Sequence, residues 1–493
     1  MHDAVLAIDL GTSAIKAVVF DFALKQCSSA SAPITTLRDN AKAEQYPEQW
    51  LSAMALAALE AITDARQQGY NINAISFTGH MSTPVFVGKD KIALGPVQTL
   101  ADQRCAGIVA ELKPQQIDLA TKITGNKPAS HFSLPKILWS LANDPHLAEK
   151  TAAILAPKDY LRLQLGGRFS SDASDAYNSL LFDLEKMDWS DLLLSEMNIS
   201  RRFMPAIRLS TDVDAGLSRG WAEKLGLDAG IPLVTGASDM ATAALACGID
   251  NKERIAVTVG TSATVLMACS NPITELVGRV TFHPAALEGL FALGSHFNGG
   301  ACLDWFHGLL SGSDEGSQQA SKKTYADLQA LAKTALHRQP ETDNPTFLPY
   351  LLGSGSPRFN AHERGVFADM SASHDHVDLF RAVIEGITLD LCQTIADFRA
   401  HNQQVDHIYA GGGGMKLELW PQLLADISGL AVKVSKNDQT SAKGAAILAC
   451  KALGVDHAMD SDEIEVFNPD PDKQKIYQMK AQRFRDLTRL LSP

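Results

Sequence analysis

The chain has few cysteines for its length, and their spacing argues against a metal or redox site. The seven cysteines are odd in number and scattered, and no Cys-x-x-Cys pair occurs. Most lie among apolar residues, where reduced thiols behave as small core side chains. This usage excludes a disulfide framework and indicates a reducing compartment. The cysteines are Cys27, Cys105, Cys247, Cys269, Cys302, Cys392 and Cys450.

Basic residues and long apolar runs are also scarce. The chain has 44 Lys and Arg residues against 56 Asp and Glu residues, which gives a net charge of −12. It contains no stripe of basic residues of the kind that binds along a nucleic-acid backbone. No apolar run reaches the length of a membrane-spanning helix. The first residues include Asp3 and Asp9 and lack the basic region of a signal peptide. We therefore expect a cytoplasmic protein with no nucleic-acid or membrane partner.

Two common nucleotide-binding motifs are absent. No Walker A pattern occurs. Four consecutive glycines at residues 411–414 follow an apolar segment, but the Rossmann spacing would need a further glycine where Lys416 stands. Consecutive glycines do allow a flat ligand to lie against bare backbone. Any nucleotide site in this chain is therefore of another type.

The length of the chain predicts more than one domain. Its 493 residues exceed what one hydrophobic core usually supports. A hydrophobic content of 45% and a charged content of 20% are globular values, with ample material for sizeable cores.

The segment at residues 5–20 predicts a β-hairpin, because two β-branched runs flank Gly11, Thr12 and Ser13. A tip of such small residues offers backbone N–H groups and hydroxyls to an anion. Asp9 ends the first strand beside this tip, and a carboxylate next to phosphate needs a divalent cation between them, for which Mg²⁺ is suited. An ordinary turn is the alternative, since these residue types are common in turns.

A second copy of the pattern favours the phosphate interpretation. Residues 255–268 repeat the apolar run, a tip of Gly260, Thr261 and Ser262, and the apolar exit, about half the chain further on. Repetition at this distance indicates two similar domains. Each would contribute one hairpin to a single bound polyphosphate.

Two further segments place polar residues next to an expected strand or helix. The strand expected at residues 74–78 leads into His80, Met81 and Ser82, where α/β sheets hold ligand-binding loops. A structural role for a single histidine is the equal alternative. Downstream, Asp102 and Arg104 precede a helical run, and there a helix cap and a solvated arginine are the plainer interpretation.

Asp239 lies on a predicted strand-to-helix turn. A strand at residues 232–235 is followed by small residues and by a helix at 240–247. Asp239 could cap that helix. A carboxylate on such a turn would also face the cleft shortly before the second hairpin, so we favour a catalytic role.

The remaining chain predicts helices and loops without recognisable chemistry. The segment at 172–177 is polar and rich in turn residues. Helices are expected at residues 132–141, 148–165, 325–336 and 381–398 and after Pro471, and a flexible loop is expected at 311–317.

Five segments in this order resemble the FGGY family of carbohydrate kinases, and xylulokinases in particular, over nearly the whole chain. The segments are residues 9–13, 236–248, 260–262, 347–353 and 411–422. The resemblance implies an α/β fold of two ribonuclease-H-like domains, as in the actin, Hsp70 and sugar kinase superfamily, around a central cleft. The domains would be residues 1–238, which bind the sugar, and 239–493, which bind the nucleotide, with the last helix packing back on the first domain.

The resemblance also implies ATP and Mg²⁺ as cofactors and a small sugar or polyol as substrate, and leaves a homodimer open. Asp239 matches the general base, and Asp9 the Mg²⁺ side of the phosphate site. The implied ATP-binding residues are Gly11, Thr12, Ser13, Lys16, Gly260, Thr261, Ser262, Gly411, Gly412, Gly413 and Gly414. The implied substrate-binding residues are His80, Met81, Ser82, Asp102, Arg104 and Met240.

Departures from the xylulokinase pattern leave the substrate open. Ser82 stands where a histidine is usual, Met240 where an asparagine is usual, and Leu100 where a tryptophan is common. Residues 353–357 read Gly-Ser-Gly-Ser-Pro in place of Gly-Glu-Arg-Thr-Pro. Sites that read hydroxyls through fixed polar groups change preference when these groups are lost. Phosphorylation of D-xylulose is the nearest family activity, and kinases of another ketose, polyol or sugar acid are the alternatives. An actin- or Hsp70-like ATPase and a catalytically silent sugar sensor are more distant ones.

Overall fold

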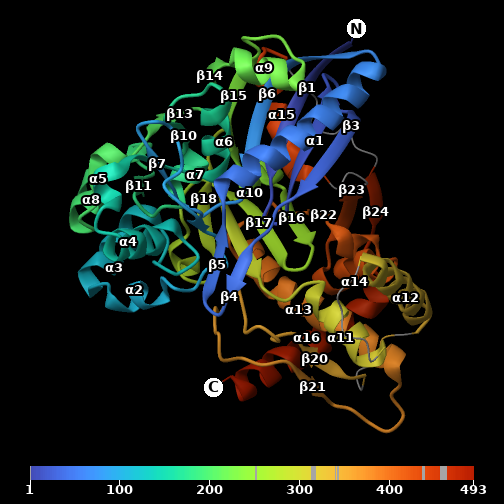
Figure 1. Ribbon diagram of the computed structural model, residues 1–493. Helices are drawn as coiled ribbons and strands as arrows, with labels where there is room; N and C mark the ends of the chain where they lie inside the picture. Colours follow the sequence, from blue (N-terminus) through green and yellow to red (C-terminus); the bar gives the residue numbers. More distant parts are fainter. Residues whose placement is uncertain are drawn as a thin grey trace.

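The computed structural model describes residues 2–249, 252–311, 318–338, 340, 344–435, 439–455 and 464–492. Two α/β domains, each built on one large mixed sheet, are joined through a shared layer of helices (Figure 1). This confirms the predicted fold class. No helix in the described part of the chain is long and apolar enough to cross a membrane.

The first sheet has six strands in the order β14-β15-β6-β1-β2-β3. The predicted first hairpin is β1 and β2, which pair antiparallel, while β6 runs parallel to both β1 and β15. The β-branched and small apolar residues of β1 are buried on both faces, as expected for a central strand. The strand bounds are β1 His2–Leu10, β2 Ala14–Asp21, β3 Gln26–Pro33, β6 Tyr70–Gly79, β14 Val213–Gly216 and β15 Pro232–Ser238.

The second sheet has seven strands in the order β18-β19-β17-β16-β22-β23-β24. Its hairpin, β16 with β17, pairs antiparallel, and β22 runs parallel to β16. The repeated sequence therefore occupies the same place in both sheets. The bounds are β16 Arg254–Val259, β17 Ala263–Cys269, β18 Thr281–Pro284, β19 Leu290–His296, β22 His407–Gly411, β23 Ala431–Ser435 and β24 Ile464–Phe467.

Two helices, α10 (Asp239–Ala246) and α15 (Thr440–Ala452), lie between the sheets (Figure 1). One buried cluster joins Val5 of the first sheet and Tyr409 of the second with residues of both helices. The two helices approach closely because Gly444 faces the backbone of α10, where an added Cβ would come within 2.0 Å of the Thr242 carbonyl oxygen. Small residues in α10 and α15 thus make the two domains one packed unit.

The outer helices cover the other faces. Helix α1 (Pro47–Gln67) packs on β2 and β3, and α13 (His376–His401) packs on the second sheet. The last helix, α16 (Pro471–Leu491), lies elsewhere than expected: Phe484 and Leu487 pack with Leu348 and Tyr350, and the helix contacts α14 (Leu419–Ser428) and α13. Helix α15, also from the second half, contacts β1, β2, β6 and β15 of the first sheet.

The middle of the first half differs from the expected long helix at 148–165. Residues 151–155 form β9, which pairs antiparallel with β7 (Val85–Gly88), and Pro157 starts a separate helix, α6 (Pro157–Leu165). Proline lacks a backbone N–H and is accommodated at a helix start, so the run is divided. The polar segment at 172–177 forms a short helix, α7 (Ala173–Tyr177), whereas the helix expected at 132–141 is confirmed as α4 (Ser133–Asn143).

The loop expected at 311–317 lies, apart from Ser311, outside the described residues, and α12 (Gln318–Leu336) includes the helix expected next. The other elements are β4 Leu37–Asp39, β5 Lys42–Gln45, β8 Val97–Gln98, α2 Ala106–Glu111, α3 Pro114–Thr124, α5 Leu147–Lys150, β9 Thr151–Leu155, β10 Ser170–Asp172, β11 Phe182–Asp183, β12 Asp188–Trp189, α8 Asp191–Glu196, η1 Arg201–Phe203, β13 Ala206–Arg208, α9 Arg219–Leu225, η2 Thr274–Leu276, α11 Ala301–Ser311, β20 Thr346–Leu348, β21 Val366–Ala368 and η3 Gly413–Lys416.

Candidate active site

Two carboxylates meet at the carboxyl edge of the first sheet. Strands β1 and β15 flank β6 in parallel, with Asp9 in register with Thr78 and Ser238 in register with Gly79. Burial and the charge of Asp9 raise the pKa of Asp239 to about 7. Burial also raises the pKa of Asp9 to about 6, although Lys16 opposes the shift. The fold thus brings together two acids that are far apart in the sequence, and their charges interact.

Asp239 is the first residue of α10 and does not cap it. The residue in the cap position is Ser238, whose side chain makes no capping hydrogen bond. The Asp239 Oδ1 atom accepts a hydrogen bond from the adjacent Met240 N–H at 2.7 Å. A cap would instead accept from a residue two or three positions further on. The Asp239 carboxylate is therefore not used as a cap of α10.

Both hairpin tips are closed by their own backbone. The Gly11 N–H donates to the Ala14 carbonyl at 3.0 Å, and the Gly260 N–H donates to the Ser262 carbonyl at 2.8 Å. Thr12, Ser13 and Thr261 are exposed, as are Gly260 and Ser262. These side chains and the adjacent backbone are accessible to a ligand at each tip.

A pair of glycines that was not predicted from the sequence as part of the site supports the second tip. The Gly300 N–H donates to the Gly260 carbonyl at 2.7 Å, and the Gly299 N–H donates to the Thr261 carbonyl at 3.1 Å. A Cβ on Gly299 would lie 2.7 Å from the Ser262 backbone. The adjacent glycines just before α11 were the sequence signal for this contact.

Lys16 connects the first hairpin to the other half of the chain. It pairs with Asp9 across the hairpin, and its Nζ donates to the Gln439 Oε1 at 3.2 Å. Gln439 immediately precedes α15. Lys16 thus places a positive charge beside the first tip. Its side chain also contacts Gln439 in the second half of the chain.

The four glycines after β22 have different roles. A Cβ on Gly412, whose φ is +89°, would lie 2.4 Å from the Val259 carbonyl oxygen, and a Cβ on Gly414 would lie 2.7 Å from the Val259 side chain. A Cβ on Gly411 or Gly413 would meet nothing within 4 Å. Gly412 and Gly414 thus allow this turn to pack against β16, while Gly411 and Gly413 leave open backbone that a ligand can approach.

His80, on the predicted sugar side, is a buried neutral histidine. Burial lowers its pKa to about 4. Its Nδ1 lies 3.1 Å from the Thr83 hydroxyl, and its ring contacts Trp50 edge-on. These contacts fix the loop that carries Met81 and Ser82, so the structure uses His80 to hold this loop.

Met81 is half-buried, whereas Ser82 is buried with a φ of +63°. Met240 is half-buried beside Asp239 at the start of α10. These three residues therefore come from the two turns that end β6 and β15.

Asp102 and Arg104 form a tight internal pair. Asp102 is fully buried and accepts hydrogen bonds from the Arg104 Nη2 at 2.7 Å and from the Ala43 N–H at 2.9 Å. Burial opposes ionisation, but these bonds hold the pKa of Asp102 below its usual range. The Arg104 guanidinium also pairs with Glu44 and lies over the Trp139 ring. Asp102 thus serves to orient Arg104.

Residues 172–177, which carry no chemistry recognisable from the sequence, belong to a buried ionic cluster. The Lys158 Nζ lies 2.6 Å from Asp159, 2.9 Å from Asp172 and 3.3 Å from Asp175. The Ser174 hydroxyl donates to Asp172 at 2.5 Å and accepts from the Ser238 N–H at 2.9 Å. The adjacent charged residues Lys158 and Asp159, immediately after Pro157 and buried at the start of α6, were the available signal. Through Ser174 the cluster supports the backbone next to Asp239.

Comparisons with known proteins cover both sheets. Residues 4–246 match the N-terminal domain, and residues 255–453 the C-terminal domain, of the FGGY family of carbohydrate kinases. A xylulose kinase from Klebsiella pneumoniae is 30% identical to this chain, over 91% of this chain and 90% of its own. A gluconokinase from Bacillus subtilis (strain 168) is 29% identical to this chain, and the match covers 100% of this chain and 96% of the gluconokinase. The crystal structure of xylulose kinase from Rhodospirillum rubrum has a TM-score of 0.89 and 25% identity, over 99% of each chain.

The matched ranges contain both hairpins and the turn that carries Asp239, and they extend over nearly the whole described fold. The similarity is therefore to the entire two-domain architecture, and the chain belongs to the FGGY family of carbohydrate kinases.

Proposed function

We propose that this carbohydrate kinase transfers the γ-phosphoryl group of ATP to a hydroxyl of a small sugar or polyol, with Asp239 as the general base. The observation that carries this assignment is the raised pKa of Asp239, about 7, caused by burial and by Asp9. A general base works best when its pKa lies near the operating pH. At neutral pH Asp239 is partly ionised and can accept the proton of a substrate hydroxyl.

The phosphate groups of ATP would lie between the two hairpin tips. Each tip presents a small-residue turn with exposed hydroxyl side chains, Thr12 with Ser13 and Thr261 with Ser262. Phosphoryl transfer asks mainly for positioning and charge stabilisation, so two turns that hold one polyphosphate supply much of what the reaction needs. The open backbone at Gly411 and Gly413 suits the flat adenine base.

Asp9 fits a role in holding Mg²⁺. Among the described residues no side chain donates a hydrogen bond to its carboxylate, and its burial raises its pKa to about 6. The described part of the chain has no group of three or more His, Cys, Asp or Glu side chains that could hold a metal. This agrees with Mg²⁺ held by one carboxylate together with substrate phosphates. The ion would neutralise charge on those phosphates.

D-xylulose is the first substrate to test, since xylulose kinase relatives match over nearly the full chain. Gluconate follows, because a gluconokinase matches to a similar extent. We infer that the sugar lies at Met81, Ser82 and Met240, which come from the turns beside Asp239 and Asp9. The departures from the xylulokinase pattern at Ser82 and Met240 favour another ketose or polyol over D-xylulose itself.

The deciding experiment is a coupled assay of ADP release with MgATP and a panel of sugars, polyols and aldonates. Release that depends on one class of sugar supports the proposal. An actin- or Hsp70-like ATPase would release ADP to the same extent without sugar. A sugar sensor without catalysis would bind a sugar by calorimetry and release no ADP.

A further inference from the structure

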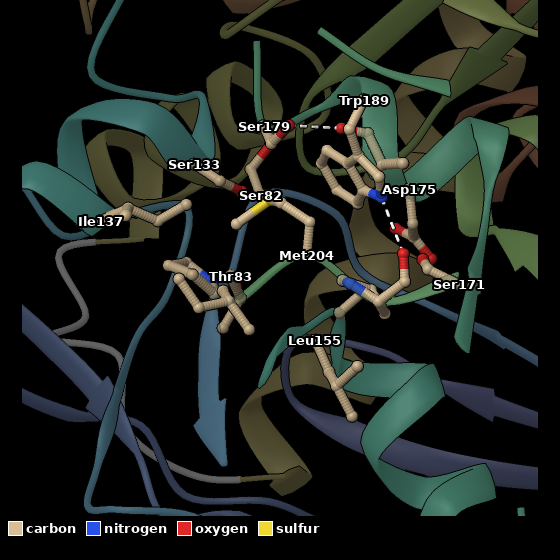
Figure 2. Close-up of a pocket in the computed structure, with 15 residues that line it drawn as sticks. Ser82, Thr83, Ser133, Ile137, Leu155, Ser171, Asp175, Ser179, Trp189 and Met204 are labelled. Carbon is tan, nitrogen blue, oxygen red and sulfur yellow. Dashed lines mark hydrogen bonds between the residues drawn. The ribbon is translucent and has the colours of Figure 1, made fainter. Parts of the chain in front are cut away.

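A small cavity lies behind Ser82 in the first domain. Its volume is about 30 Å³, which is room for about two water molecules. The loop at residues 82–84, α4, the end of β9, α7 and the segments at Trp189 and Met204 line it, and it is partly open (Figure 2). Its walls are mixed, since nine of the fifteen lining residues are apolar and six are polar. The polar groups can bind a hydroxyl group in place of water when a ligand supplies one.

The walls of this cavity carry several hydroxyl groups. Ser82, Thr83, Ser133, Ser171 and Ser179 all line it. The hydroxyl proton of Ser171 is donated to Asp159 at 2.5 Å, and that of Ser179 is donated to the Ala176 carbonyl at 2.5 Å. Since these protons are used elsewhere, both oxygens can only accept toward the cavity. The Ser179 Oγ already accepts from the Leu181 N–H at 3.0 Å, so one lone pair remains there.

Asp175 adds a carboxyl group with spare hydrogen-bonding capacity. Its side chain is 1% exposed and lines the cavity, and its Oδ1 has no hydrogen-bond partner among the described residues. Lys158 approaches the other oxygen, Oδ2, at 3.3 Å. Burial, assisted by Asp172 and Asp159, raises the pKa of Asp175 well above its ordinary value despite Lys158. A protonated carboxyl both donates and accepts, which matches a hydroxyl group.

Both walls of the cavity are attached to the strands that carry the two active-site carboxylates. On one side the His80 N–H, two residues before Ser82, donates to the Leu10 carbonyl at 2.9 Å, next to Asp9. On the other, the Ser174 hydroxyl, one residue before Asp175, accepts from the Ser238 N–H at 2.9 Å, next to Asp239. The cavity therefore belongs to the same sheet edge as the candidate active site.

We propose that this cavity is a subsite for the uncharged, hydroxyl-bearing end of the substrate, the end away from the hydroxyl that is phosphorylated. The inference rests on the proposed function. Asp175 exchanges hydrogen bonds with a terminal hydroxyl, and Ser82 leaves room for that end where the xylulokinase pattern has a larger histidine. The substrate is accordingly a neutral sugar or polyol long enough to reach from Asp239 to Asp175.

The charge of the buried cluster selects against a sugar acid. Four carboxyl groups, those of Asp159, Asp172, Asp175 and Asp214, surround only two cations, Lys158 and Arg162. A carboxylate end in this cavity would add a further buried negative charge, and uncompensated buried charge is strongly unfavourable. Gluconate is therefore a poorer substrate than a neutral sugar or polyol of equal length.

The test measures the KM of two Asp175 variants for substrates of different length. Asp175→Leu removes the polar group, and Asp175→Asn keeps donor and acceptor at similar size. We expect Asp175→Leu to raise the KM of six-carbon sugars and polyols by about tenfold, the effect of losing one hydrogen bond, while the KM of glycerol stays the same. Asp175→Asn should retain most of the wild-type selectivity.

Ser82→His tests the mouth of the cavity. It should lower kcat/KM for six-carbon substrates relative to glycerol. The matched control is Ser195→His, on the exposed face of α8, which should change neither. Thermal melting and MgATP calorimetry on each variant show that the fold and the nucleotide site remain intact.

The outcomes separate the two proposals. ADP release with no sugar, polyol or aldonate in the panel would overturn the proposed function. Release that is selective for sugars, but with the same KM ratio of long to short substrates in wild type and Asp175→Leu, would overturn the subsite alone. Wild-type preference for gluconate over neutral six-carbon substrates would also overturn it. Should Asp175→Leu fail to fold, the same ratios measured with Ser82→His decide the question.

Discussion

Burial, together with the charge of Asp9 at the end of β1, raises the pKa of Asp239 at the start of α10 to about 7. Because β1 and β15 lie on either side of β6, each carboxylate lies within the electrostatic reach of the other. A cation bound at Asp9 would weaken this interaction and lower the pKa of Asp239. Binding of a cation at Asp9 would therefore increase the fraction of Asp239 that is ionised and able to accept a proton.

Replacing Asp239 by asparagine removes the proposed base at nearly constant size. We expect kcat to fall by about 10²–10⁴, the usual contribution of a positioned general base. Binding of MgATP by calorimetry should be unchanged. A variant that turns over sugar at the wild-type rate would leave Asp239 without a catalytic role.

The same substitution should affect stability in a pH-dependent way. The pKa of Asp239 is raised from 3.8 to about 7, so the folded protein binds its proton more tightly than the unfolded chain does. Stability is therefore lost as pH rises from about 4 to about 7. Asp239→Asn removes this loss, so its Tm should exceed the wild-type Tm at about pH 8 and match it at about pH 4. Equal Tm differences at both pH values would contradict the raised pKa.

Gly260 tests whether the second hairpin holds phosphate. An added Cβ at Gly260 would lie 3.7 Å from its nearest neighbour, the Ser262 carbonyl oxygen, so the fold itself has room for a side chain. The Tm of Gly260→Val should therefore lie within a few degrees of the wild-type Tm. Its affinity for MgATP should nevertheless be much lower, because the valine methyl groups occupy the space through which phosphate approaches the backbone. Normal MgATP affinity in calorimetry would show that one hairpin suffices.

The tetraglycine turn offers a matched pair of substitutions. Gly411→Ala places a methyl group in open space, whereas Gly412→Ala places it against the Val259 backbone at a φ of +89°. We expect Gly412→Ala to lower the Tm clearly, through strain and the clash. Gly411→Ala should leave the Tm unchanged and weaken ATP binding. If both variants change the Tm equally and neither changes ATP affinity, the division of roles at this turn is wrong.

Restoring the xylulokinase pattern tests the sugar contacts. Ser82→His combined with Met240→Asn should raise kcat/KM for D-xylulose, because polar groups that read hydroxyls return to the site. Residue 82 has a φ of +63°, a region in which histidine is tolerated better than most residues. A folded double variant that binds MgATP and gains nothing on D-xylulose would refute this assignment. So would a wild-type enzyme that prefers D-xylulose to every other sugar in the panel.

What could be derived from the sequence is mostly local. The tips at Gly11 and Gly260 and the strand-to-helix turn at Asp239 depend on residues adjacent in the chain, so alternation and turn chemistry predicted them correctly. The repeat of one hairpin indicated the second sheet. The helix expected at residues 148–165 failed because the pairing of β9 with β7 is a long-range contact that local propensity does not contain.

The tertiary structure alone decided which charges meet. Asp9 and Asp239 interact because parallel strands bring distant residues to one sheet edge, and Asp175 joins Lys158 only after α6 and α7 pack beneath that edge. The raised pKa values of the three aspartates arise mainly from burial, which the finished core imposes on side chains that would be fully solvated in the unfolded chain.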